Sequence, residues 1–378
     1  METFKLLATA ASGIESIVGN ELKHMGYNVQ VENSRVRFEG TMEDVINTNL
    51  WLRSADRVKI IVGEFTATTF DDLFEQTKAI SWDKFLPLDA EFPVQGKSQK
   101  STLYSVPDAQ AIVKKAIVDQ LSDVYHRTTR LPETGAKYPL EVAINKDNVL
   151  LTLDTTGSSL FKRGYRVEKG YAPLKENMAA ALVMLTNWYP DKPFVDPVCG
   201  SGTIPIEAAL IGHNIAPGIG RYFVFEDWDF VEKGLFDRLR ETAKGEANLD
   251  VVLDIAGYDI DAGMIEIAKK NAAEAGVLDS IEFKQLAAKD FTTEKENGVL
   301  VANPPYGERL SDTESVRVLY KQMGVVYKQM PTWSKYILTS DLTFEEYYGS
   351  RASKKRKLYN GSLRTDYFQY WGKRKPRV

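Results

Sequence analysis

The sequence contains little cysteine and histidine and no long hydrophobic run. Its single cysteine, Cys199, excludes an internal disulfide and fits a reducing, cytoplasmic environment. Three isolated histidines offer no zinc-site spacing, so we expect no metal: His24, His126 and His213. No apolar stretch approaches the ~20 residues of a membrane span, and the first residues lack a secretory-signal pattern. We therefore expect a cytoplasmic protein without a membrane partner.

The net charge of −4 conceals an uneven distribution along the chain. Residues 351–378 hold ten Lys/Arg and one acid, Asp366, so this segment carries +9 and the remainder −13. Salt screens surface charges beyond ~8 Å under physiological conditions. A basic segment can therefore bind phosphates although the whole chain is acidic.

Residues 1–64 show the element order of a ferredoxin-like α+β unit. Apolar positions at helical spacing and alternating strand patterns predict this order. Gly26 is well placed to end the first helix. The expected elements are a strand over 4–9, a helix over 14–25, a hairpin over 29–38, a helix over 41–52 and a strand over 57–62.

Residues 65–160 form a second predicted α/β unit. Helical spacing covers 71–80 and 108–121, and a hairpin is expected over 140–153. Between the helices lies a stretch rich in amines and hydroxyls that includes Lys97, Ser98 and Lys100. Such groups suit contacts with phosphates.

Residues 161–378 alternate strand and helix, which predicts a mostly parallel, Rossmann-like α/β sheet with helices on both faces. The expected strands cover 194–196, 255–260, 281–285, 298–302 and 336–339. Helices are expected over 203–211 and 262–275.

A glycine-rich turn follows the first of these strands, in the run Asp196-Pro197-Val198-Cys199-Gly200-Ser201-Gly202-Thr203. Glycine lets the backbone approach a ligand closely, and the following helix N-terminus can hold a carboxylate. The run is neither a G-x-G-x-x-G fingerprint nor a phosphate-binding loop with a lysine, which disfavours a pyrophosphate or triphosphate. Cys199 stands beside no base and is expected to be a small buried residue rather than a nucleophile.

Further acids follow the next two strands. Asp259 ends the second strand and is expected to bind ribose hydroxyls, whereas Asp261 is expected to cap the following helix. Asp290 could accept a hydrogen bond from an adenine amino group, and Phe291 could pack on the ring. Together these residues predict a cradle for S-adenosylmethionine.

The tetrapeptide Asn303-Pro304-Pro305-Tyr306 follows the fourth strand. Its prolines restrict the backbone, so the Asn303 side-chain oxygen and the Pro304 carbonyl can point at one amino group. Tyr306 offers a face on which a planar base or amide can stack. The pattern predicts methyl transfer to an exocyclic or amide nitrogen, in which the protein mainly aligns the reactants.

These motifs closely resemble those of the THUMP-domain RNA methyltransferases. Asp196 to Ala209 resembles the cofactor motif of that family, and Asn303 to Leu310 its acceptor motif. Lys162 to Arg166 with Ala172 to Asn177 resembles the entry to its catalytic domain. The run Leu358-Tyr359-Asn360-Gly361 resembles its C-terminal strand region, and the stretch around Gly96-Lys97-Ser98 its THUMP core.

The resemblance implies a fold, a reaction and a set of site residues. The fold would be a ferredoxin-like unit (1–64), a THUMP domain (65–160) and a Rossmann-like methyltransferase domain (161–378). The reaction would be formation of N2-methylguanine in 23S rRNA or a large-subunit precursor. The implied cofactor-binding residues are Asp196, Pro197, Cys199, Gly200, Ser201, Gly202, Thr203, Asp259, Ile260, Asp290 and Asn303. The implied catalytic residues are Asn303, Pro304, Pro305 and Tyr306. The residues expected to bind RNA, because of their amines, hydroxyls and charge, are Lys97, Ser98, Lys100, Lys354, Lys355, Arg356 and Lys357.

Three alternatives stay open at this point. A DNA adenine-N6 methyltransferase shares the tetrapeptide, and a protein-glutamine methyltransferase would grip an amide in the same way. A non-catalytic RNA-binding assembly factor could retain the fold. The basic run at 354–357 suits either RNA or a solvated tail, and the sequence leaves the oligomeric state open.

Overall fold

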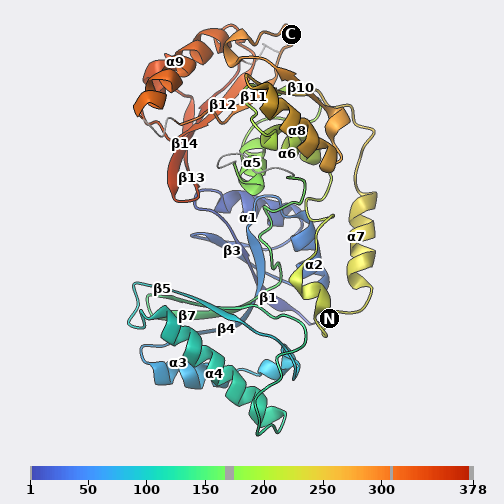
Figure 1. The fold of residues 1–378 in the computed structure, drawn as a ribbon, viewed down its shortest axis with the longest axis vertical. Coiled ribbons are helices and arrows are strands. Elements are labelled where there is room, and N and C mark those ends of the chain that lie inside the picture. Colours follow the sequence, from blue (N-terminus) through green and yellow to red (C-terminus); the bar gives the residue numbers. More distant parts are fainter. Residues whose placement is uncertain (1, 167–173, 307–309, 374–378) are drawn as a thin grey trace.

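Two seven-stranded sheets, stacked along the long axis of the molecule, form the framework of the protein (Figure 1). The computed structural model describes residues 2–166, 174–306 and 310–373, without the side chains of residues 310–313. Within these ranges no helix is both long and apolar enough to cross a bilayer.

The first sheet has the strand order β2-β3-β1-β4-β7-β6-β5. Its strands are β1 (Phe4–Thr9), β2 (Gln30–Glu32), β3 (Arg35–Gly40), β4 (Arg57–Thr66), β5 (Val94–Gln99), β6 (Leu140–Asn145) and β7 (Asn148–Asp154). Its helices are α1 (Glu15–His24), α2 (Met42–Trp51), α3 (Phe70–Lys78) and α4 (Val106–Val124). The element order expected for residues 1–64 is confirmed, as are the two helices and the hairpin expected for residues 65–160. The stretch between those helices, expected only to suit phosphates, forms strand β5.

Local sequence explains several element ends. Thr41 and Asp44 form a capping box that begins α2, in which the Thr41 N–H donates to Asp44 Oδ2 at 2.7 Å. Gly26 follows α1 with a φ of +96°, a conformation that costs glycine little. These signals lie in the sequence, which is why the elements could be placed from it.

Strand β4 joins the two N-terminal units into one sheet. Its residues 57–60 pair with β1, as in Leu6↔Ile60, and its residues 59–66 pair with β7 on the other side, as in Phe65↔Val149. The register shifts between Ile61 and Gly63, which marks a bulge in the strand. The expected boundary between residues 64 and 65 therefore falls within a continuous strand.

The second sheet has the strand order β10-β9-β8-β11-β12-β14-β13. Its strands are β8 (Phe194–Asp196), β9 (Ile255–Asp259), β10 (Ile281–Gln285), β11 (Val299–Ala302), β12 (Ser334–Thr339), β13 (Lys354–Asn360) and β14 (Leu363–Tyr370). The first five in chain order are parallel, and β14 pairs antiparallel with both β12 and β13. Chain order reverses between β8 and β11, the switch point at which such sheets bind ligands.

Among the described residues, the C-terminal half contains six α-helices. They are α5 (Glu176–Met184), α6 (Thr203–Gly212), α7 (Leu235–Gly245), α8 (Ala262–Glu274), α9 (Leu310–Tyr327) and α10 (Phe344–Tyr348). Helices α6 and α8 confirm the two expected from the sequence.

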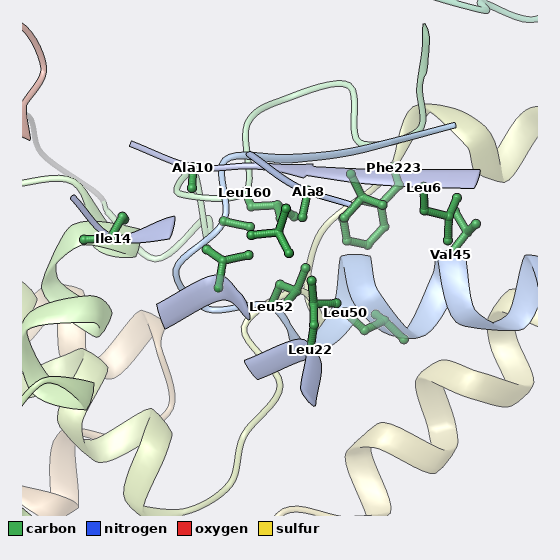
Figure 2. Close-up of a cluster of buried hydrophobic side chains, with 14 of the residues drawn as sticks. Leu6, Ala8, Ala10, Ile14, Leu22, Val45, Leu50, Leu52, Leu160 and Phe223 are labelled. Atoms are coloured by element: carbon green, nitrogen blue, oxygen red, sulfur yellow. The ribbon is translucent and has the colours of Figure 1, made fainter. Parts of the chain in front are cut away.

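The region between α6 and β9 reaches back to the N-terminal sheet, where α7 lies beside α2 (Figure 1). Trp228 stacks on Tyr138 with ring centroids 5.0 Å apart, and its indole N–H donates to the Lys137 carbonyl at 2.8 Å. In Figure 2 Phe223 lies beside Leu6 and Val45 in one buried cluster. The halves therefore share a hydrophobic core, which fixes the methyltransferase half against the N-terminal sheet.

Candidate active site

The glycine-rich turn lies between the end of β8 and the start of α6. Gly200 has a φ of +51° and Gly202 a φ of +81°. A Cβ on Gly202 would lie 2.9 Å from Ala268 Cβ on α8, so this glycine permits close helix packing. A Cβ on Gly200 would meet nothing closer than Met264 Cε at 3.9 Å. Gly200 therefore leaves open space above the turn.

Asp196 ends β8 beneath this space and is only 1% exposed. Its Oδ1 accepts a hydrogen bond from the Val198 N–H at 3.1 Å. Burial raises the pKa of Asp196 well above its ordinary value; that hydrogen bond opposes the rise and the nearby Asp259 adds to it. Burial likewise raises the pKa of the Cys199 thiol, with the two acids adding to the effect. A neutral, buried thiol is a packing group rather than a nucleophile.

Asp259 supports the turn from the end of β9. Its Oδ2 accepts from the Gly200 N–H at 2.9 Å, and its Oδ1 accepts from the Asp261 N–H at 3.0 Å. A carboxylate has about four acceptor positions, so room for a ribose hydroxyl is left. Asp261 accepts from the Gly263 N–H at 2.7 Å and caps α8, which confirms its expected role.

The expected adenine side of the cradle is exposed. Ile260, directly after β9, is 70% exposed, so its apolar side chain can cover a flat ring. Asp290 is exposed at the end of a short 3-10 helix. Phe291 differs from the expectation, because it is only 3% exposed and packs against Tyr258 and Trp333. Its ring belongs to the core and has no face free for adenine.

Arg166 contacts the glycine-rich turn, a role that its sequence motif did not predict. Its guanidinium is held by Glu176 at 2.9 Å and reaches the hydroxyls of Ser201 at 3.3 Å and Thr203 at 3.2 Å. Asn271 of α8 donates to the Ser201 carbonyl at 3.0 Å from the other side. An arginine and two hydroxyls beside a helix N-terminus suit a carboxylate. Only the fold brings Arg166, 35 residues away in sequence, to this turn.

A buried ion pair fixes the helix that follows the turn. Glu207 of α6 is fully buried, and its Oε1 lies 3.4 Å from Arg163 Nε and 3.0 Å from the Tyr165 hydroxyl. Arg163 also donates to the Arg53 carbonyl in the N-terminal half. Helix α6 is therefore linked through Arg163 to the ferredoxin-like unit.

The acceptor tetrapeptide begins directly after β11. Asn303 Oδ1 accepts a hydrogen bond from the Tyr306 hydroxyl at 2.5 Å. Pro304 is buried and Pro305 exposed, and the Tyr320 hydroxyl lies 3.4 Å from the Pro305 carbonyl. Burial raises the pKa of Tyr306, with the Asn360 side chain opposing the rise and Tyr320 adding to it. The Tyr306 hydroxyl is therefore neutral, and it donates to Asn303 Oδ1, the atom expected to accept a hydrogen bond from the substrate.

The strand register places the two half-sites at one edge of the sheet. Strands β8 and β11 are parallel neighbours, with Leu300 opposite Val195. Asp196 and Asn303 therefore both leave the sheet at its carboxyl edge, next to the switch point. The residues beyond Tyr306 in the acceptor motif, 307–309, lie outside the described part of the chain.

Six of the seven residues expected to bind RNA lie on two edge strands, one in each sheet. Lys97 in β5 pairs with Glu141 at 2.8 Å, Ser98 donates to the Leu103 carbonyl, and Lys100 is exposed at the following turn. The basic run 354–357 forms the start of β13 rather than a tail.

Two members of that run already have partners. Lys355 pairs with Glu345 at 2.8 Å, and Arg356 donates to the Gly13 carbonyl and to Ser16 Oγ of the N-terminal half. Burial lowers the pKa of Arg356, with Glu15 opposing that effect. Arg356 therefore joins the two halves, and Lys354, Lys355 and Lys357 are the exposed residues of the run.

Comparison with known proteins places this site in a family. The model of the RMKL-like methyltransferase domain matches residues 163–369, that of the RlmL ferredoxin-like domain residues 5–59, and that of the THUMP domain residues 67–154. The chain belongs to the RMKL-like methyltransferases. The three-part fold and the cofactor S-adenosylmethionine, both expected from the sequence, are confirmed for this family member.

Relatives of the family align over nearly the whole chain. A Bacillus subtilis protein named "Putative RNA methyltransferase YpsC" is 55% identical over 100% of this chain and 98% of its own. The ribosomal RNA large subunit methyltransferase K/L of Syntrophotalea carbinolica is 34% identical over 95% of this chain and 52% of its own. The chain thus spans about half the length of that K/L enzyme.

Two solved structures share the architecture closely. One, named as a predicted N6-adenine-specific DNA methylase from Listeria monocytogenes, is 63% identical with a TM-score of 0.95, covering 99% of this chain and 97% of that one. The other, SMU.472 complexed with SAH, is 53% identical with a TM-score of 0.95 and full coverage of both chains. The open space at Gly200, the exposed Ile260 and the hydroxyls beside Arg166 fit such a cofactor.

Proposed function

We propose that this family member methylates RNA and forms N2-methylguanine in large-subunit ribosomal RNA. The observation that carries the proposal is the position of Asn303, which leaves β11 beside the glycine turn at the switch point of the sheet. The THUMP domain and relatives named as RNA methyltransferases support RNA as the substrate.

S-adenosylmethionine, when bound, supplies a methyl group activated on a sulfonium. In the proposal Asp196, Gly200 and Arg166 bind its amino-acid end, and Asp259 with Ile260 binds the adenosine end. Asn303 Oδ1 and the Pro304 carbonyl accept the two N–H groups of the target amine, which orients its lone pair. Tyr306 gives up its hydrogen bond to Asn303 and packs on the base.

This arrangement requires no strong general base. The nitrogen becomes acidic only after it has been methylated, so water can take the proton. The contribution of the protein is to bring nitrogen and methyl carbon to ~3–3.5 Å in line.

The choice of guanine over adenine rests on the resemblance to the THUMP-domain RNA methyltransferases, because both bases carry an exocyclic amine. A second candidate is adenine-N6 methylation of DNA, favoured by the shared tetrapeptide and by the name that the Listeria protein carries. The THUMP domain is the feature that makes structured RNA the better proposal.

The test is methyl transfer from labelled S-adenosylmethionine to purified ribosomal RNA, tRNA and genomic DNA in parallel, followed by nucleoside analysis. Label in ribosomal RNA as N2-methylguanosine is the expected result. Label in DNA as N6-methyladenine would show that the substrate is DNA, while the proposed transfer to an exocyclic amine would stand. Cofactor binding without label in any nucleic acid would contradict the proposal and favour a glutamine side chain of a protein as the methyl acceptor.

A further inference from the structure

A cleft of about 1000 Å³ opens where the N-terminal sheet, the segment after β7 and the region after α6 meet. Seven Lys/Arg and three acids line it, so its net charge is positive. We call it the junction cleft and define it by Lys97, Lys162, Arg221 and Tyr222. Its size is at the upper end of the range for ligand sites.

Three of the seven cations that line the junction cleft pair with two of its carboxylates. Lys59 and Lys97 both pair with Glu141, and Arg57 pairs with Asp154. These three cations are therefore largely neutralised.

Two other cations of the cleft, Lys162 and Arg221, form no ion pair with a carboxylate among the described residues. Lys162 is exposed, and Arg221 donates to the backbone carbonyls of Ser158, Ser159 and Lys162. Burial lowers the pKa of Arg221 to about 10, and the nearby Arg163 and Arg57 lower it further while Asp154 opposes them. Arg221 remains charged at neutral pH, in surroundings that favour an anion.

An aromatic side chain accompanies these cations. Tyr222 lines the junction cleft and is 56% exposed, with its hydroxyl held by Asp227. Phe161 also lines it, beneath Lys175 Nζ at 4.8 Å from the ring centre. Cations interleaved with an exposed aromatic face suit a single-stranded nucleic acid, because every base can stack.

A smaller cavity of about 280 Å³ adjoins the junction cleft and shares two of its wall residues, Asp56 and Lys175. Asp56 is fixed by a hydrogen bond from Asn177 Nδ2 at 3.0 Å. The far wall includes Asn360, whose side chain interacts with the Tyr306 hydroxyl at the acceptor site. We call this second space the passage, defined by Asp56, Lys175 and Asn360. Asn360 contacts Tyr306, which in turn donates to Asn303, so the passage is two side-chain contacts away from the acceptor atom.

We propose that a single-stranded segment of the substrate RNA lies in the junction cleft and that its target nucleotide reaches Asn303 through the passage. Lys162 and Arg221 bind phosphates of this segment, Tyr222 stacks on one of its bases, and Lys175 contacts the backbone next to the target. The inference rests on the proposed function, namely that the chain methylates a base in RNA. It places RNA between the two halves rather than on the basic run of β13.

Binding variants give the first test, with ribosomal RNA that the wild-type protein methylates. Tyr222→Leu should raise the KM for RNA about tenfold, whereas Tyr222→Phe keeps the ring and should match wild type. Lys162→Glu should weaken binding and flatten the dependence of log Kd on log salt by about 0.7 per lost phosphate contact. The control is Lys233→Glu, an exposed lysine that is not among the lining residues of the cleft. All four variants should keep the wild-type cofactor Kd and melting temperature.

Crosslinking gives the second test, because the native Cys199 is buried. A photoreactive group is attached to a cysteine introduced at Lys175, Tyr222 or, as control, Lys233. Crosslinks from position 175 should map closest to the methylated base, those from 222 farther along the same strand, and none should arise from 233.

The outcomes separate the two proposals. If wild-type protein methylates RNA but the cleft variants bind it like Lys233→Glu, the route is wrong and the proposed function stands. Crosslinks from 175 and 222 to unrelated RNA regions would also overturn the route. If wild-type protein methylates no RNA in the parallel assay, the proposed function fails and the route fails with it.

Discussion

The two halves of the candidate site differ in how completely the protein has built them. In the cofactor half the backbone is held by its own acids: Asp259 binds the Gly200 N–H at 2.9 Å and Asp196 the Val198 N–H at 3.1 Å. In the acceptor half the side chains bind each other, since Tyr306 donates to Asn303 at 2.5 Å. In the proposed reaction the first half is preorganised for the cofactor, whereas the second must exchange an internal hydrogen bond for one to the substrate.

This difference indicates where specificity can arise. A preorganised cofactor site costs little to occupy, because its polar groups already have the geometry the ligand needs. In the proposed reaction the Tyr306 hydroxyl is displaced from Asn303 Oδ1 only by a substrate group that donates an equally good hydrogen bond to it. An analogue without an N–H at that position would leave a polar atom unpaired, which costs about 1–3 kcal/mol.

Asn303→Ala should break the acceptor half alone and have the largest effect. We expect turnover to fall about 10²–10³-fold, the size of effect seen when one preorganised polar contact to a reacting group is removed. The cofactor Kd, measured by calorimetry, should change little. Tyr306→Phe is the control, because it removes only the hydroxyl that substrate displaces and should keep most of the activity. An equal loss of cofactor binding in Asn303→Ala would show that the halves are not separate.

Asp259→Ala should break the cofactor half. Loss of a charged acceptor for ribose, together with a freed Gly200 N–H, should raise the cofactor Kd about 10–100-fold. Turnover at saturating cofactor should stay close to wild type. Asp261→Ala is matched to it, since this neighbour only caps α8 and should cost ~1 kcal/mol of stability without changing cofactor affinity. Equal cofactor Kd values for the two variants would refute the assignment of Asp259.

The two glycines of the turn should separate stability from binding. Gly202→Ala places a Cβ 2.9 Å from Ala268 at positive φ and should destabilise the fold by at least ~2 kcal/mol. Gly200→Ala meets only Met264 at 3.9 Å and should cost ~1 kcal/mol. Its Cβ would instead point into the proposed cofactor space and raise the cofactor Kd about tenfold. Thermal unfolding and calorimetry on both variants test this, and an unchanged cofactor Kd in Gly200→Ala would move the ligand away from the turn.

The smallest expected effect is a pH dependence confined to the cofactor half. Burial raises the pKa of Asp196 in the free protein, and the cofactor ammonium would favour the carboxylate instead. Binding should therefore release a proton, and the cofactor Kd should fall as pH rises through the raised pKa, by at most about tenfold per pH unit. Because burial raises the Asp196 pKa in the folded state, folding stability should fall as pH rises from the ordinary aspartate pKa to the raised one.

Calorimetric titrations at successive pH values above the ordinary aspartate pKa of ~3.9 would measure this slope. Asp196→Asn should abolish the slope while Asn303→Ala retains it. A slope that survives in Asp196→Asn would assign the titration to another group.

Much of the fold could be predicted because its signals are local. Gly26 ends α1, Thr41 caps α2, and Asp261 caps α8, each through contacts within a few residues. The parallel strands could be recognised because they are short apolar runs that end at Asp196, Asp259 and Ala302. The continuity of β4 between the two N-terminal units could not, because strand pairing with β7 depends on residues about 90 positions away.

The residues of the candidate site also divide into those predictable from local sequence and those that depend on distant packing. The motif residues of both halves could be named in advance, since each follows a strand directly. Arg166 could not be assigned to the glycine turn, and Phe291 was expected at a ligand although it is buried in the core. Arg356 looked like an RNA contact but donates to Gly13 across the junction. Each of these depends on which distant segment packs against the residue.

The sequence by itself determined the chemistry of this protein: a glycine turn, strand-tip acids and an Asn-Pro-Pro-Tyr motif follow successive strands, and parallel strands must bring their carboxyl ends to one edge. Only the tertiary structure decided how the halves meet. Hydrophobic burial around Phe223 and Trp228 acts between segments far apart in the chain and leaves no local pattern. That packing ties the cofactor helix to the N-terminal unit, forms the junction cleft, and sets which basic residues remain free to bind a substrate.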